Sequence, residues 1–169
     1  MPLKIVCGDI CKMDVDAIVN AANSALKMGG GVCGAIFRAA GEKQLAKECG
    51  SIGGCDTGKA VLTKGYNLLS KYIIHTVGPI WRGGWEGEKE LLRGCYKNSL
   101  NLAASSGCKS VAFPLISAGI YGYPKEQAIE AAVTSIKEFL KSNVMEVYLV
   151  LFDSDDINIA EKISDSVNS

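Results

Sequence analysis

Short apolar runs recur along this chain, separated by polar segments that are rich in turn-forming residues. The runs favour β-branched and aromatic side chains and predict six strands, at residues 3–7, 17–20, 60–63, 72–77, 111–115 and 147–152. Several runs are apolar at consecutive positions, which is typical of strands that helices cover on both faces.

Longer segments repeat their apolar residues at helical spacing. One stripe consists of Leu92, Cys95, Tyr96, Ser99, Leu100 and Ala103. A second consists of Ile129, Ala132, Val133, Ile136 and Leu140. Pro124 suits the first turn of the helix that carries the second stripe. A last helix is expected after residues 155–156, with an inner side of Ile159, Ala160, Ile163 and Val167.

This order of elements predicts the α/β class, as a three-layer α/β/α sandwich with a central mixed sheet. The chain has 169 residues, and 48% of them are hydrophobic. That is enough for one well-packed core and too little for two, so we expect a single domain over residues 1–169.

The charge balance narrows the choice of partners. Eighteen acidic residues offset eighteen basic ones, so no overall field attracts the chain to nucleic acid or to a membrane surface. No apolar run approaches the length of a membrane-spanning helix, and no charged-then-apolar leader opens the sequence. Phosphate binding, if present, must therefore depend on local groups.

Seven cysteines without regular spacing indicate free thiols in a reducing compartment, and we expect a cytoplasmic location. Cys7 and Cys11, four residues apart, are the sharpest candidates for a zinc site. The single histidine, His75, lies within an apolar strand and is interpreted as a core residue, and the chain has no CxxC pair. We therefore expect no metal and no cofactor.

Glycine carries the first functional information. Residues 28–34, here called the glycine tract, read MGGGVCG and lead into a predicted helix. Glycines before a helix let backbone N–H groups surround an anion, although a tight turn is the simpler explanation. A second loop, residues 114–124, also joins a buried strand to a helix. Two such loops at the carboxyl ends of neighbouring strands would form one crevice able to hold a diphosphate.

Two familiar phosphate motifs do not apply. The tract satisfies GxGxxG, but it follows the second strand, and the acid about 20 residues on, Glu48, falls in a helical segment. Residues 53–60 resemble a P-loop, but Ala60 stands where a magnesium-binding hydroxyl is needed, and a strand follows.

Taken together, the motifs resemble the macrodomain family. They are GDI at 8–10, AIVNAAN at 17–23, the glycine tract, HTVGP at 75–79, ISAGIYGYP at 116–124 and LFD at 151–153. They run in order over nearly the whole chain. The resemblance is closest to the branch that hydrolyses ADP-ribose esters, including O-acetyl-ADP-ribose and mono-ADP-ribosylated proteins.

The resemblance implies a ligand and its contacts. Asp9 would accept the adenine amino group, since a carboxylate is only an acceptor, and the Ile10 backbone would read the adjacent ring nitrogen. Phe152 would pack on adenine, and Asn23 would hold the distal ribose. The diphosphate would receive backbone N–H donors from Gly30, Gly31, Val32, Ser117, Gly119, Ile120 and Tyr121. The simpler explanations are a cap for Asp9, ordinary core for Phe152 and a turn for Asn23.

One departure from the family pattern bears on mechanism. The hydrolytic branch has an aspartate and a histidine where this sequence has Cys33 and Phe37. A water held by Asn23 and the substrate phosphate, with or without help from the Cys33 thiol, is the catalytic hypothesis. Cys33 as a small residue that merely fits the loop is its alternative.

Three functions are therefore compatible with the sequence. The first is an ADP-ribosyl hydrolase or O-acetyl-ADP-ribose deacetylase, for which we name Asn23 and Cys33 as catalytic. The second is a reader module that binds ADP-ribose without removing it. The third is a sensor of a cyclic or phosphorylated ADP-ribose. None requires a metal, and the expected partners are ADP-ribose, its derivatives and mono-ADP-ribosylated proteins.

Overall fold

The computed structural model describes residues 3–167 and contains one mixed sheet. Its strands, in the order β1-β6-β5-β2-β4-β3, are parallel except for β3, which is antiparallel to β4. Their bounds are β1 Leu3–Cys7, β2 Ala17–Ala21, β3 Ala60–Lys64, β4 Tyr72–Thr76, β5 Ser110–Phe113 and β6 Glu146–Leu151. The predicted strands are confirmed, with ends that differ by at most two residues.

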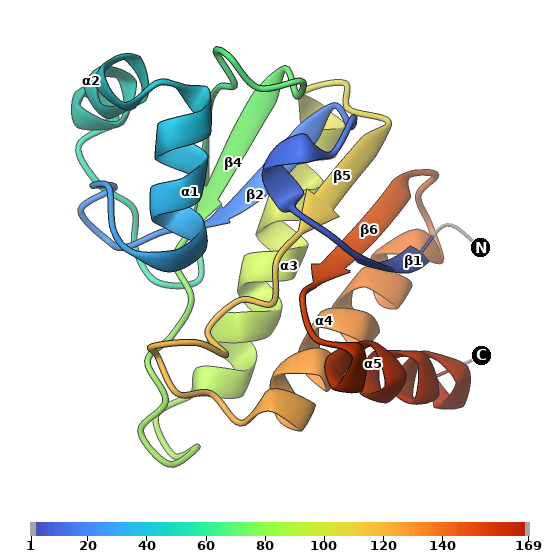
Figure 1. The fold of residues 1–169 in the computed structure, drawn as a ribbon. Coiled ribbons are helices and arrows are strands. Elements are labelled where there is room, and N and C mark those ends of the chain that lie inside the picture. The colour runs from blue at the N-terminus through green and yellow to red at the C-terminus, as the bar shows by residue number, and fades with distance from the viewer. Residues whose placement is uncertain (1–2, 168–169) are drawn as a thin grey trace.

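Helices cover both faces of the sheet, as Figure 1 shows. One face carries α1 (Gly31–Ala40) and α2 (Glu42–Ile52), and the other carries α3 (Glu88–Ser105), α4 (Lys125–Leu140) and α5 (Ser154–Ser166). A short 3-10 helix, η1 (Ile10–Lys12), follows β1. The three-layer α/β/α sandwich predicted from the sequence is confirmed.

Alternation along the strands divides the core into two parts. In β2, Ala17 and Val19 belong to the cluster packed under α3, α4 and α5, whereas Ile18 belongs to the cluster under α1 and α2. All three side chains are at most 1% exposed. Both faces of this central strand are therefore buried, which explains its uninterrupted apolar run.

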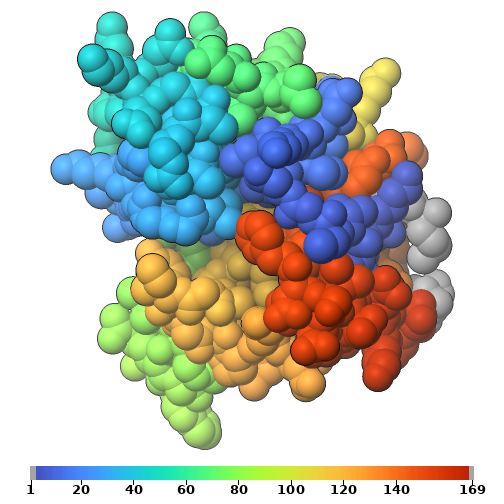
Figure 2. All heavy atoms as spheres, in the orientation of Figure 1, coloured from blue at the N-terminus to red at the C-terminus, as the bar shows by residue number. Residues whose placement is uncertain are grey.

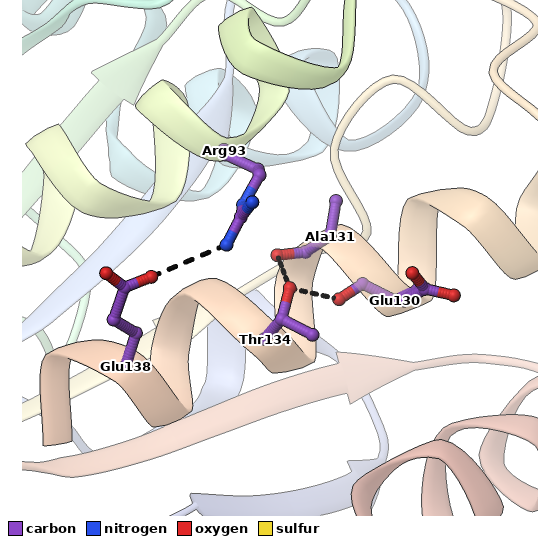
Figure 3. Close-up of polar contacts among 5 residues, drawn as sticks. All are labelled: Arg93, Glu130, Ala131, Thr134 and Glu138. Carbon is purple, nitrogen blue, oxygen red and sulfur yellow. Dashed lines mark hydrogen bonds and ion pairs between the residues drawn. The ribbon is translucent and has the colours of Figure 1, made fainter. Parts of the chain in front are cut away.

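Helices α3 and α4 pack through the two predicted stripes, whose residues are buried except for Leu140. At their surface an ion pair joins Arg93 and Glu138 at 3.4 Å (Figure 3). Because this pair is solvent-exposed, it contributes at most about 1 kcal/mol. Pro124 is the N-cap of α4 and lies just before its first turn.

The last helix packs less deeply than the other helices. Of its predicted inner residues Ala160 is buried, but Ile159, Ile163 and Val167 are only partly covered. None of the helices within residues 3–167 is long and apolar enough to cross a membrane.

Candidate ligand-binding site

The carboxyl ends of the parallel strands meet at one edge of the sheet, where a cavity of about 500 Å³ opens. Its walls are the segments after β1, β2, β4, β5 and β6 together with the start of α1. Figure 2 shows the blue α1, the orange loop after β5 and the red segment after β6 on one face. Among the residues that line this main cavity are all the predicted ones: Asp9, Ile10, Asn23, Gly30, Gly31, Val32, Cys33, Ser117, Gly119, Ile120, Tyr121 and Phe152.

A larger cavity, of about 630 Å³, lies between α3 and α4. Its walls are a mixture of charged and amide side chains, and it contains none of the predicted site residues. The chemistry suggested by the sequence is therefore concentrated in the main cavity.

The glycine tract presents the start of α1 to the main cavity. Gly31 begins the helix with a left-handed φ of 55°, which glycine adopts at little cost. A Cβ on Gly34 would lie 2.5 Å from the carbonyl oxygen of Gly29, so only glycine lets the tract fold back onto the helix. The first turn of α1 contains no acidic residue, and no side chain caps it. Its N–H groups are therefore available to an anion.

The second loop faces the tract from the other side of the cavity. Hydrogen bonds from Gly122 N to Gly119 O and from Tyr123 N to Ser117 O, both 3.0 Å, close the loop on itself. Ser117 has a left-handed φ of 68°, and its buried hydroxyl has no partner within residues 3–167. A strained residue with an unsatisfied donor is typical of a ligand-binding loop.

Backbone donors converge between these two loops. In the described part of the chain, the N–H groups of Gly31, Val32, Gly119 and Ile120 donate to no carbonyl or side-chain acceptor. All four residues line the main cavity. This arrangement, with the positive end of the α1 dipole beside it, suits a diphosphate.

Asp9 and Phe152 follow the neighbouring strands β1 and β6, so they mark the end of the main cavity on that side of the sheet. Asp9 Oδ1 accepts a hydrogen bond of 2.9 Å from Cys11 N and caps η1, so the predicted capping role is real. The Cys11 thiol also lies close enough to this carboxylate to interact with it. Phe152 is 73% exposed although it lines the cavity, and the interpretation of this residue as ordinary core is therefore wrong. An exposed ring can stack on an aromatic base, and a carboxylate beside it has further acceptor sites for the hydrogen bonds of that base.

Asn23 and Cys33 lie close together in the main cavity and share one acceptor. The Asn23 amide donates to Lys27 O at 2.8 Å and accepts from Lys27 N at 3.0 Å, so it also holds a turn, as the simpler explanation proposed. The Cys33 thiol donates to the same carbonyl oxygen at 3.7 Å. Cys33 is only 6% exposed and occupies the first turn of α1. The side chains that we named as catalytic are thus neighbours.

A buried polar chain that the sequence analysis missed lies behind Cys33. Asn20 Nδ2 contacts Cys33 Sγ at 3.6 Å and His75 Nδ1 at 3.0 Å, and His75 Nε2 contacts Thr63 Oγ1 at 2.9 Å. Because the amide nitrogen only donates, Nδ1 accepts and the imidazole proton is on Nε2. Burial lowers the pKa of His75 to about 4, so the ring is neutral.

His75 is thus a core histidine with satisfied nitrogens, as the sequence analysis expected. Asn20, a polar residue at the end of an apolar strand, was the available signal for the rest of the chain. Phe37, where the hydrolytic branch has histidine, is 1% exposed and packs edge-on against His75 with ring centroids 6.5 Å apart. It does not line the main cavity.

The cysteines are all free thiols. Within residues 3–167, no group of three or more histidine, cysteine, aspartate or glutamate side chains is placed to hold a metal ion. Cys11 lines the main cavity, and burial raises its pKa to about 11, so its thiol stays protonated near neutral pH.

A mostly parallel α/β/α sandwich with N–H donors gathered at the carboxyl ends of its strands is the architecture of a domain that binds phosphorylated ligands. A family model described as the Macro domain matches residues 19–132. The chain belongs to the macro domain family, and the resemblance seen in its motifs is confirmed.

Relatives and a solved structure resemble this chain over most of its length. An O-acetyl-ADP-ribose deacetylase of Citrobacter rodentium is 46% identical over 167 residues, covering 95% of this chain and 94% of the relative. ADP-ribose glycohydrolase MACROD2 of Homo sapiens is 56% identical over 146 residues, covering 86% of this chain but 34% of that protein. A glycine-to-valine mutant of the Oceanobacillus iheyensis macrodomain with ADPR superposes with a TM-score of 0.93 at 41% identity, covering 98% and 92% of the two chains.

Proposed function

We propose that this chain binds ADP-ribose and hydrolyses ADP-ribosyl esters, either O-acetyl-ADP-ribose or mono-ADP-ribosylated protein. The observation that carries the proposal is the order of groups along the main cavity. Asp9 and Phe152 follow the neighbouring strands β1 and β6, the second loop with its unpaired N–H donors follows β5, and Asn23, beside the Cys33 thiol, follows β2, so the strand order places these groups in sequence along the main cavity. This order matches adenine, diphosphate and distal ribose. The names of the deacetylase and glycohydrolase relatives support the same activity.

Each part of the ligand has a partner in this proposal. Asp9 accepts the adenine amino group, the Ile10 backbone meets the adjacent ring nitrogen, and Phe152 stacks on the ring. The two loops donate their N–H groups to the diphosphate from Gly30, Gly31, Val32, Ser117, Gly119, Ile120 and Tyr121. The buried hydroxyl of Ser117, which has no partner among residues 3–167, adds one more donor.

The reaction takes place at the distal ribose. Water adds to the ester, the bond to the acid breaks, and a carboxylic acid and ADP-ribose leave. Asn23 is already fixed by Lys27 and orients the ribose hydroxyls and the water through its remaining amide proton and oxygen lone pair. Cys33, beside it, takes part in moving the proton of the water. The cytoplasm, as a reducing compartment, suits the free thiols of such an enzyme.

One observation favours the reader function as a second candidate. Asp9 is the one acidic residue among those of residues 3–167 that line the main cavity, and it lies at the adenine end. The distal-ribose end therefore has no carboxylate to act as a general base. A protein that retains ADP-ribose rather than releasing it is compatible with this.

Two measurements on the purified protein test the proposal. Calorimetry is expected to show that ADP-ribose binds well ahead of AMP, because AMP lacks the distal half, and ahead of NAD, whose nicotinamide crowds the distal end. A time course with O-acetyl-ADP-ribose and with mono-ADP-ribosylated protein is expected to release ADP-ribose. Equal affinity for AMP and ADP-ribose contradicts the single cleft. Tight ADP-ribose binding without release of product favours the reader.

A further inference from the structure

A third, smaller cavity of about 320 Å³ adjoins the main cavity, and we call it the side cavity. Gly78 and Tyr121 line both of them, so the two spaces share a wall. Gly78 packs so closely on Ser117 that a Cβ there would overlap the Ser117 side chain. A glycine is therefore needed at the place where the cavities meet.

The side cavity adjoins the ribose end of the main cavity and not the adenine end. Ser24, the residue after Asn23, lines the side cavity, whereas Asp9, Ile10, Cys11 and Phe152 line only the main cavity. A group attached to the distal ribose of a bound ADP-ribose would therefore leave the main cavity toward the side cavity.

The far wall of the side cavity is a loop at residues 79–87 that is held firmly in shape. The buried Glu88 carboxylate accepts hydrogen bonds from Arg82 N and Gly84 N, both 2.9 Å, and from Glu86 N at 2.7 Å. Burial opposes its ionisation, but these N–H donors prevail and lower the pKa of Glu88 to about 2. Trp81 N also donates to Tyr121 O at 2.8 Å, which ties the loop to the second loop of the main cavity.

This fixed loop presents unusual side chains to solvent. Trp85 is 91% exposed and Ile80 is 49% exposed, and both are large apolar residues. Arg82 and Glu86 line the side cavity and are exposed, with no side-chain partner within residues 3–167. An aromatic residue and an unpaired arginine on a preformed surface are the residue types that most often dominate binding to polypeptides.

We infer that the side cavity and its loop hold the polypeptide that flanks an ADP-ribosylated side chain. The inference rests on the proposed function and adds to it a subsite for the protein part of a conjugate, which a small ester does not occupy. An acetyl group would leave most of a 320 Å³ cavity empty. A polypeptide fills it, places backbone amides against Arg82 and Glu86, and covers the Trp85 ring.

The test uses two ligands for binding, two substrates for turnover and three variants of the full chain. The affinities of free ADP-ribose and of a mono-ADP-ribosylated peptide are measured by calorimetry, and release of ADP-ribose is followed from that peptide and from O-acetyl-ADP-ribose. The variants are Arg82→Ala, Trp85→Ala and, as a control, Leu69→Ala, which removes an apolar side chain 67% exposed and away from both cavities. None of them alters a residue that contacts ADP-ribose in the proposal.

The wild type is expected to bind the modified peptide more tightly than free ADP-ribose. Trp85→Ala and Arg82→Ala are each expected to lower the affinity for the peptide by about 5- to 10-fold. The affinity for free ADP-ribose and the turnover of O-acetyl-ADP-ribose are expected to stay unchanged. Leu69→Ala is expected to change nothing.

Three results would overturn the inference. One is an equal affinity of the wild type for the peptide and for free ADP-ribose, and another is an equal loss of affinity for these two ligands in the variants. The third is an unaltered affinity of both variants for the peptide. By contrast, a wild type that binds neither ligand would refute the proposed function itself. Because binding is measured independently of turnover, the comparison tests the subsite even for a reader module that does not hydrolyse its ligand.

Discussion

Cys33 occupies a position at which a side chain touches both the ligand cavity and the core. Its sulfur contacts the carbonyl of Lys27, in the loop before the glycine tract, and the amide of the buried Asn20. Asn20 is in turn fixed by a neutral His75. The thiol is therefore held in one orientation by groups that do not contact the ligand, which is how a reactive group is kept in place.

If the thiol moves a proton in the reaction, Cys33→Ala is expected to slow release of ADP-ribose by about 10²–10⁴-fold, with ADP-ribose affinity nearly unchanged. Single-turnover assays and calorimetry measure the two effects. Cys49→Ala is the matched control, because Cys49 is a buried thiol near His75 that does not line the main cavity.

An alanine variant that keeps the wild-type rate would assign the water to Asn23 and the substrate phosphate, in which case Asn23→Ala loses the rate instead. Cys33→Asp adds the carboxylate of the hydrolytic branch. A large gain in rate would mean that the natural residue favours retention of ADP-ribose over turnover.

Replacing Phe152 is expected to change ADP-ribose affinity but not the stability of the fold. Its ring is 73% exposed, so Phe152→Ala removes little packing and is expected to change the free energy of unfolding by less than about 0.5 kcal/mol. Loss of stacking on adenine is expected to weaken ADP-ribose binding by about 1–3 kcal/mol. Denaturant titration and calorimetry on the same preparation check both values, and normal binding by a folded variant would refute the adenine assignment.

At the scale of elements, the loops after the strands carry the ligand contacts, and their shape depends on close backbone packing. The glycine tract is the clearest case, because Gly29 packs its carbonyl against Gly34 one turn into α1. A helix that begins against its own preceding loop keeps its first N–H groups pointed at the cavity.

Gly34→Ala is expected to push the tract off the helix and to weaken ADP-ribose binding, with a loss of about 1–3 kcal/mol in stability from the forced contact. Gly50→Ala provides the control. It lies in the exposed part of α2 with nothing near a Cβ, and it is expected to stabilise the protein by about 0.5–1 kcal/mol. Thermal unfolding with and without ADP-ribose distinguishes the two, and a Gly34→Ala variant with normal affinity would contradict this account.

At the scale of the whole molecule, the sandwich encloses its single histidine completely. The Asn20–His75–Thr63 chain lies on the sheet face beneath α1 and α2, and His75 is 0% exposed. The pKa of His75 is about 4 in the folded protein against 6.5 in an unfolded chain. Below pH 6.5 the unfolded state therefore binds a proton that the folded state does not.

Stability is thus expected to be complete above pH 6.5 and to fall as the pH is lowered from 6.5 to about 4, by at most about 3 kcal/mol. Because the chain has one histidine, the slope between pH 6.5 and 5 belongs mainly to this residue. Denaturant unfolding at several pH values, with an NMR titration of the imidazole, tests it. A titration midpoint near 6.5 in the folded protein would contradict the neutral, buried ring.

The Glu88 carboxyl affects stability at lower pH than His75 does. The pKa of its carboxyl is about 2 in the folded protein against an ordinary value of 4.5. Its contribution is therefore present above pH 4.5 and disappears as the pH falls toward 2, a range that overlaps that of His75 only between about pH 4 and 4.5.

The sequence by itself determined the elements and the two phosphate loops. Apolar runs and helical stripes record which faces are buried, and burial on both faces of the strands implies the three layers. Glycine-rich segments mark where the backbone must turn left-handed or pack closely, as at Gly31 and Gly34. These are local properties, and a local pattern reports them directly.

Only the tertiary structure decided how distant residues meet. Placing β2 between β5 and β4 brings Asn20 beside His75, although 55 residues separate them, and Cys33 contacts Asn20 on its other side. The tertiary structure also leaves the Phe152 ring exposed, and it places Gly78 and Tyr121 in the wall that the main cavity and the side cavity share. In the sequence pattern, an apolar residue at the end of a strand looks the same whether its side chain is buried in the core or lines a cavity. Strand order and the loops that cross it, which the chain pattern does not encode, decide between them.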